Sequence, residues 1–117
     1  MTSPEASLRA LGDKNRLLLL RLLLESQLSV GELTRISGLG QSLVSHHLAV
    51  LVRHGWVAGR QVGRQRIYQP NVGSGPLAVL AQWVKQQVPL PVNWQEAKPV
   101  ETATDSRERR DLEDYLL

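Results

Sequence analysis

Apolar and polar residues are most clearly separated in residues 41–54. Val44, Leu48 and Leu51 recur at helical spacing, so they lie on one side of a helix. The other side carries small polar groups and no carboxylate. A helix whose outer face only had to stay in water would usually carry Glu and Lys there, often four residues apart. The pattern therefore predicts a helix whose polar face binds a partner, and small hydrogen-bonding groups favour the major groove of DNA.

Two helices are expected near the start of the chain. Residues 5–12 form a short helix that a glycine ends. Asp13 can cap a second helix that runs to about Glu25. Leucines cover so much of this second helix that it must be central to the core, with Arg16 and Arg21 marking its wetter side.

A third helix is predicted by a capping box. Ser29 and Glu32 have the Ser-x-x-Glu spacing in which each side chain bonds to the other residue's backbone N–H. This helix ends near Gly38, so only residues 38–40 separate it from the helix at 41–54. Two short helices joined by a glycine turn, the second with a polar outer face, are typical of a helix-turn-helix.

A hairpin is expected directly after these helices. Residues 56–62 and 65–69 have strand-like patterns, and Gly63-Arg64 forms the turn between them. The tip and flanks of the hairpin carry Arg60, Arg64 and Arg66. Such a hairpin is the wing of a winged helix, whose strands lie beside DNA and whose arginines reach phosphates or a minor groove.

The last predicted helix, residues 75–88, has an apolar stripe with Trp83 at its edge. The stripe consists of Leu77, Leu80, Ala81, Val84 and Val88. A stripe of this kind is usually core. A small domain cannot easily bury it together with Leu8 and Leu11, however, so we expect these residues to form a homodimer interface across a two-fold axis.

The remaining chain is expected to lie outside the domain. Residues 1–88 form the DNA-binding and dimerisation domain, and residues 89–105, with three prolines and no sustained period, form an extended linker. Residues 106–117 form a short helix or tail. Two interpretations of this tail stay open: a frayed acidic end, or a peptide that docks on a protein.

Charge is divided unevenly along the 117 residues, whose net charge is +3. Residues 1–88 hold ten Lys and Arg against four acids, and no Asp or Glu occurs between Glu32 and Glu96. A basic solvated surface would not by itself exclude every carboxylate from this interval, so a polyanionic partner is favoured. The leucine run at residues 17–24 is too short to cross a bilayer, and we expect a soluble, cytoplasmic protein.

Over roughly residues 5–88 the chain resembles the ArsR family of bacterial winged-helix repressors. The most specific parts are Ser-x-His-Leu at 45–48 and Arg-x-x-Gly-Arg-x-x-x-Tyr at 60–68. The resemblance implies a mainly α fold with a small β-hairpin (α+β), a winged helix-turn-helix. It also implies a homodimer, built from the first and last helices of this domain, that binds an inverted-repeat operator in double-stranded DNA and releases it on a signal.

The metal sites of that family are missing from the sequence. The resemblance places two cysteines of metal sensors at Ser29 and Gly31, and neither residue can supply a thiolate. A second family site uses His and carboxylates on the last helix, and residues 75–88 contain none. We therefore expect no family-type metal and no cofactor, while an unrelated site or a small organic ligand stays open.

The two adjacent histidines are assigned to DNA rather than to catalysis or metal. His46 and His47 point about 100° apart on a helix, so they cannot hold one metal together, and no carboxylate stands near them in sequence to orient a base. We expect no enzyme activity. His46 shares the outer face with the serines. His47 lies toward the core edge, where packing and phosphate contact are as plausible as contact with a base.

The candidate contacts form two sets. Base or groove contacts are expected from Gln41, Ser42, Ser45 and His46. Phosphate or wing contacts are expected from Arg35, His47, Arg53, Arg60, Arg64 and Arg66. The alternative function is a winged-helix protein-interaction module that acts through the C-terminal tail, although such a module has no need of an acid-free interval.

Overall fold

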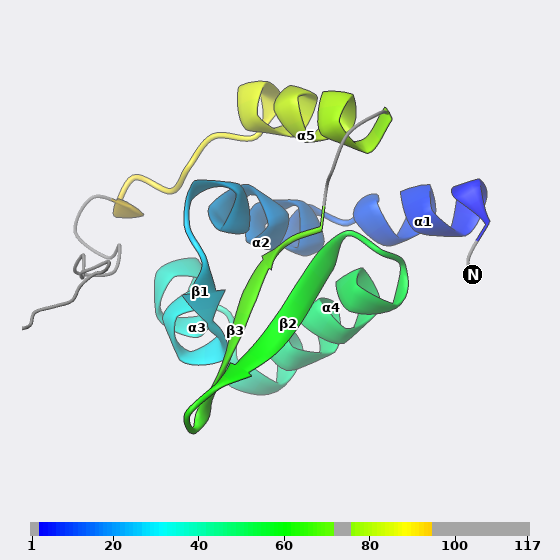
Figure 1. The fold of residues 1–117 in the computed structure, drawn as a ribbon. Coiled ribbons are helices and arrows are strands. Elements are labelled where there is room, and N and C mark those ends of the chain that lie inside the picture. Colours follow the sequence, from blue (N-terminus) through cyan, green and yellow to red (C-terminus); the bar gives the residue numbers. More distant parts are fainter. Residues whose placement is uncertain (1–2, 72–75, 95–117) are drawn as a thin grey trace, which may run out of the picture.

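The computed structural model describes residues 3–71 and 76–94. In these residues the chain forms five helices and a small antiparallel sheet of three strands (Figure 1). The elements in chain order are α1 (Pro4–Leu11), α2 (Lys14–Glu25), β1 (Leu28–Ser29), α3 (Val30–Ser37), α4 (Gln41–Arg53), β2 (Val57–Val62), β3 (Gln65–Pro70) and α5 (Pro76–Gln87). This is the mainly α winged helix-turn-helix that the sequence predicted.

The predicted helix caps are present. The Asp13 carboxylate accepts hydrogen bonds from the backbone N–H groups of Asn15 and Arg16, at 2.9 and 3.1 Å. These bonds, above all that from Arg16, hold the pKa of Asp13 below its usual value. Ser29 and Glu32 form the reciprocal capping box. α3 and α4 therefore begin and end within a residue of the predicted positions.

The core is aliphatic and centred on α2. Its leucines at positions 19, 20, 22 and 23 are buried, as is the predicted apolar face of α4 at Val44, Leu48 and Leu51. Burying one such side chain contributes about 1.5–3 kcal/mol of hydrophobic stabilisation. The apolar face of α4 therefore holds this helix firmly on α2 and leaves its other face in solvent.

The sheet contains one strand that the sequence did not predict. β2 and β3 form the expected hairpin around Gly63, whose φ of 61° is the left-handed conformation that glycine adopts without strain. The strand β1 adds to the outer side of β3, with Leu28 opposite Tyr68 and Ser29 opposite Ile67. Two residues are too few to show an alternating pattern, so this strand leaves no signal in the sequence.

Trp56 joins three parts of the fold. Its backbone N–H donates to the carbonyl oxygen of Leu51 in α4, at 2.9 Å, and its own carbonyl accepts from the N–H of Asn71 after β3, at 2.8 Å. Its indole Nε1–H donates to the carbonyl oxygen of Ser7 in α1, at 2.7 Å. The end of α4, both ends of the hairpin and α1 thus meet at one buried side chain.

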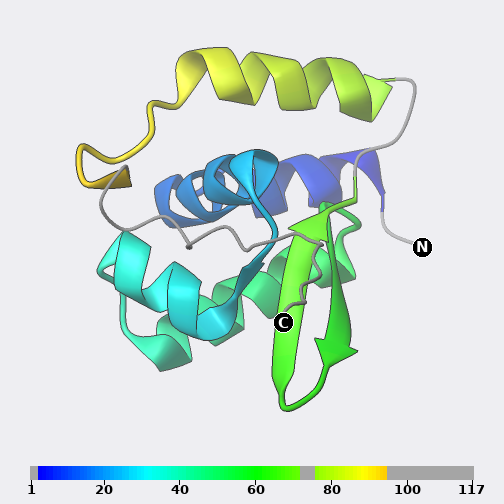
Figure 2. The same ribbon diagram turned by 60° about the vertical axis from the view of Figure 1, so that its left-hand side comes forward.

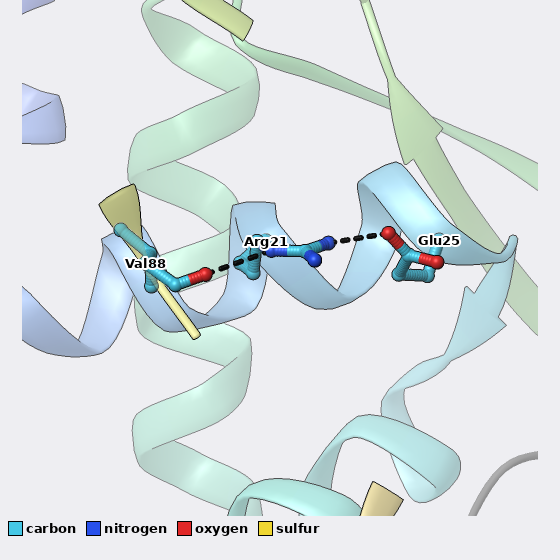
Figure 3. Close-up of polar contacts among 3 residues, drawn as sticks. All are labelled: Arg21, Glu25 and Val88. Carbon is cyan, nitrogen blue, oxygen red and sulfur yellow. Dashed lines mark hydrogen bonds and ion pairs between the residues drawn. The ribbon is translucent and has the colours of Figure 1, made fainter. Parts of the chain in front are cut away.

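The placement of Arg21 corrects an expectation, because this residue is buried rather than on a wetter side of α2. Its Nε donates to the carbonyl oxygen of Val88, at 2.8 Å, and its Nη1 lies 2.5 Å from a carboxylate oxygen of Glu25 (Figure 3). The buried guanidinium is stabilised because it donates both hydrogen bonds, and bonds from a charged donor are stronger than those between neutral groups. They attach the end of α5 to α2.

The chain also stays on the domain beyond residue 88, where the linker was expected to begin. Leu90 packs against the core, and Trp94 is part of the core cluster, with 8% of its surface exposed. The domain therefore continues to residue 94, because these two apolar side chains pack on the hydrophobic core. The rest of the predicted linker and the predicted tail at 106–117 lie outside the described residues. In the described part, no helix is both long enough and apolar enough to span a membrane.

Candidate nucleic-acid interface

The predicted groove contacts share one exposed face of α4. Gln41, Ser42, Ser45 and His46 are all exposed, while the opposite face is buried in the core. The helix begins at Gln41, and Gly40 before it has no side chain that could cap the first turn. The first backbone N–H groups of α4 therefore stay available to an anion, as at the helix N-termini that bind phosphate.

The wing presents three exposed arginines beside this helix. Arg60 donates to the side-chain oxygen of Gln27 at 2.7 Å, and the guanidinium of Arg66 lies 6.0 Å from the ring centre of Tyr68. Arg64, at the hairpin turn, makes no hydrogen bond or ion pair within residues 3–71 and 76–94. Arg64 can therefore contact a phosphate without first breaking a contact of its own.

The acids of the described chain all belong to elements other than α4 and the hairpin. Asp13 and Glu32 serve as helix caps, and Glu25 is paired with Arg21. Neither α4 nor the hairpin contains a carboxylate, whereas Arg35 and Arg53 are exposed nearby. Figures 1 and 2 both place the hairpin turn at the end of the molecule opposite α5. One end of the molecule is thus basic, and α5 lies at the other.

The phosphate contact predicted for His47 does not agree with its position. The ring is 6% exposed and lies on the buried side of α4. Its Nδ1 is 3.1 Å from Nη1 of Arg16, so this histidine contacts α2 rather than solvent. Burial is the main cause that lowers its pKa below the ordinary 6.5, because the charged form loses hydration. The side chain of His47 cannot reach a phosphate from there.

The residues predicted for a dimer interface divide into two groups. Leu8 of α1 and Trp83 of α5 are 56% and 53% exposed, so both side chains are available to a partner. Leu11, Ala81 and Val84 are instead buried within the chain, and Leu80 and Val88 are partly buried. The stripe on α5 therefore faces α2 in the same chain. Leu77 is in α5, but its side chain lies outside the described set.

Three residues relevant to these surfaces were missed from the sequence. Val79 is 72% exposed on α5, and Leu43 is 40% exposed in the first turn of α4. A helical wheel centred on the buried residues would have found both, because each lies away from the core direction. Arg16, which contacts His47, could not have been found in this way, since the two residues are 31 positions apart.

Metal ligands do not gather in the described part of the chain. Among residues 3–71 and 76–94, no three His, Asp or Glu side chains lie close enough to hold an ion. Ser29 and Gly31, where the family resemblance places cysteines, line a hollow of about 220 Å³ near the turn of the hairpin. Its other lining residues are Val30, Arg64, Gln65 and Arg66.

Sequence comparison gives a family model and a relative. Residues 13–58 match the model of the bacterial regulatory protein, arsR family. The transcriptional activator HlyU of Vibrio cholerae is 43% identical over 61 residues, which are 52% of this chain and 56% of HlyU. In sequence, the chain therefore matches only about half the length of this relative.

Solved structures extend the similarity over most of the domain. Reduced HlyU from Vibrio cholerae has 33% identity and a TM-score of 0.63, covering 70% of this chain and 84% of HlyU. The transcriptional repressor BigR from Xylella fastidiosa has 32% identity and a TM-score of 0.60, covering 68% and 77%. The homodimeric winged helix-turn-helix domain Mb0332 from Mycobacterium bovis shares the fold, at 24% identity and a TM-score of 0.62, over 70% and 74%. The chain belongs to the arsR family of bacterial regulatory proteins.

Proposed function

We propose that the chain is a sequence-specific DNA-binding transcription regulator in which α4 reads the major groove and the hairpin contacts DNA beside it. The observation that carries this proposal is the joint surface of α4 and the hairpin, which is polar, basic and free of carboxylates. Gln41 and the serines can bond base edges, while the arginines and the uncapped start of α4 can bond phosphates. The regulatory function of the chain's named relatives supports the same conclusion.

We further propose that the working form is a homodimer that binds an inverted repeat. Leu8 of α1 and Val79 and Trp83 of α5 are large apolar side chains that are exposed, and α5 lies at the end of the molecule away from the hairpin turn (Figure 2). A two-fold contact through these helices would leave both copies of α4 free for two half-sites. Repression is the simpler direction of control, because occupation of an operator is enough to exclude other proteins.

The test is binding to an operator selected from fragments of the source genome. Fluorescence anisotropy should give a Kd that rises with salt, with a log–log slope of roughly 0.9 for each phosphate contacted. Arg64→Ala should reduce this slope by about one such unit. Ser45→Ala should weaken the selected site by about fivefold, with little effect on unrelated DNA.

The matched control for Arg64→Ala is Lys85→Ala, which removes an exposed cation from α5 at the opposite end of the molecule. Lys85→Ala should leave both the Kd and the salt slope unchanged. Equal binding by wild type, Ser45→Ala and Arg64→Ala would contradict the assignment of α4 and the hairpin to DNA. A reporter gene placed behind the selected operator then separates repression from activation.

A further inference from the structure

Arg16, in the first turn of α2, contacts both α1 and α4. Its Nε donates to the carbonyl oxygen of Ala10, near the end of α1. Its Nη1 lies 3.1 Å from Nδ1 of His47, in the middle of α4. One guanidinium therefore links a helix of the proposed dimer surface to the helix of the proposed DNA surface.

The contact with Arg16 fixes where His47 carries its proton. A guanidinium can only donate hydrogen bonds, so Nδ1 of His47 must be the acceptor. The single proton of the neutral ring is then on Nε2. This atom is buried and has no hydrogen-bond partner among the described residues. A second proton would have to go to Nδ1, where it would face the donors and the positive charge of Arg16.

Burial is the main effect that disfavours that second proton, because a charged imidazolium loses its hydration. The charged groups around His47 act in both directions. Asp13 on α2 favours a positive charge on the ring and has the largest effect of these groups, whereas Arg16 on α2 and His46 on α4 oppose one. Together, burial and these two cations outweigh Asp13, so the pKa of His47 is lowered.

We propose that Arg16 and His47 are positioning residues that hold the recognition helix α4 against α1, and that this hold requires a neutral His47. The inference rests on the proposed function, because it concerns how the DNA-reading helix is kept in place. A second set of contacts joins α1 to the other end of α4. The Trp56 indole donates to the Ser7 carbonyl oxygen, and the Ser7 hydroxyl donates to the His54 carbonyl oxygen, so no atom in these contacts titrates.

The expected effect of pH follows from the position of His47. Its pKa is about 6.5 in the unfolded chain and lower in the folded chain. At a pH between these two pKa values, the unfolded chain therefore binds more protons than the folded one. The contribution of the Arg16–His47 contact is therefore complete above pH 6.5 and is lost as the pH falls below it. Asp13, whose pKa is lowered from 3.8, does not titrate in that range.

The experiment measures operator affinity and thermal unfolding of the full chain between about pH 7.5 and about pH 5.5, at constant ionic strength. Wild-type affinity should fall as the pH falls, by at most about tenfold per pH unit for each subunit bound, the limit for one coupled proton. Most DNA-binding proteins would show the opposite trend, because protonation adds positive charge. His47→Gln keeps an acceptor and a donor without titrating, so it should abolish the fall.

His46→Gln is the matched control, because it removes the neighbouring histidine from the exposed face. It should weaken binding at every pH but keep the fall in affinity at low pH. Arg16→Met removes the cation that faces Nδ1 and should reduce the dependence on pH, as His47→Gln does. Imidazole ¹⁵N NMR of the wild-type chain should show the proton of His47 on Nε2, which tests the geometry without any substitution.

The outcomes separate this inference from the proposed function. If the wild type binds its operator but His47→Gln keeps the same pH dependence, or if NMR places the proton on Nδ1, the role of the Arg16–His47 contact is overturned and DNA binding stands. If no DNA is bound at any pH, the proposed function fails. The dependence of thermal unfolding on pH, compared between wild type and His47→Gln, still decides whether the contact requires a neutral ring.

Discussion

Leu43 is an apolar residue in the first turn of α4, where its neighbours Ser42 and Gln41 are polar and exposed. It is 40% exposed and lies beside the face proposed to enter the major groove. The apolar group that this groove offers is the C5-methyl group of thymine. A leucine at this position can therefore add a preference for thymine that hydrogen bonds alone would not provide.

We predict that Leu43→Ala weakens binding to the selected operator by about fivefold, the effect of losing roughly 1 kcal/mol of apolar contact. Replacing one particular thymine in each half-site by deoxyuridine should weaken the wild type equally and leave Leu43→Ala unaffected, because both changes remove the same contact. Val92→Ala, which shortens an exposed side chain beyond α5, is the control. If Leu43→Ala and the deoxyuridine substitution weaken binding additively at every thymine, Leu43 does not contact a thymine methyl group.

Buried polar residues were the ones that the sequence predicted least well. Arg21 was placed toward solvent, because arginine is seldom buried without partners, and His47 was placed at the core edge, where packing and phosphate contact both stayed open. Their partners are supplied by the tertiary fold, 67 positions away for Arg21 and 31 for His47. Local patterns contain no information about such contacts, whereas the apolar positions of α4 needed only the helical period.

Helix boundaries were predicted well because their signals are local. The capping box of α3, the Asp13 cap of α2 and the glycine turn before α4 each act within four residues. The packing of α5 was less predictable, since its apolar stripe could face its own chain or a partner. The structure turns Ala81 and Val84 toward their own chain, and Arg21 fixes the end of the helix there.

The attachment of α5 to α2 gives a prediction about stability. Arg21→Ala should lower the free energy of unfolding by about 2 kcal/mol, because it leaves the Val88 carbonyl and the Glu25 carboxylate without their partner. The loss should be smaller than for a fully buried ion pair, since Glu25 remains partly exposed. Urea denaturation of Arg21→Ala beside Lys14→Ala, an exposed cation of the same helix, measures it. Equal midpoints for the two variants would show that the contact does not stabilise the chain.

On the scale of the whole molecule, the proposed DNA contacts lie on α4 and the hairpin, whereas three other exposed apolar side chains lie on α1 and α5. These side chains are Leu8 in α1 and Val79 and Trp83 in α5, and α5 lies at the end of the molecule opposite the hairpin turn (Figure 1). Large apolar side chains that gather on one part of a surface usually mark an interface with another protein. In the homodimer that we propose, two copies joined through α1 and α5 would leave α4 and the hairpin of each copy uncovered.

A double substitution tests the dimer. Val79→Lys together with Trp83→Lys should convert a dimer into a folded monomer, because both side chains are exposed and contribute little to the core of their own chain. Light scattering during size-exclusion chromatography gives the mass, and circular dichroism checks the fold. Val92→Lys, a charge placed on an exposed position outside these helices, should leave the mass unchanged. A wild type that elutes as a monomer at high concentration would rule the homodimer out.

The meeting of three elements at Trp56 has a mechanical consequence. Its indole binds α1, while its backbone binds both the end of α4 and the residue that follows the hairpin. The end of α4 and the hairpin are therefore both bonded to the residue that binds α1, so we expect them to move together relative to α1. In the proposed homodimer on DNA, a small rotation between the subunits would then move both elements away from DNA together, so a signal that acts at the dimer interface would be enough to release the operator.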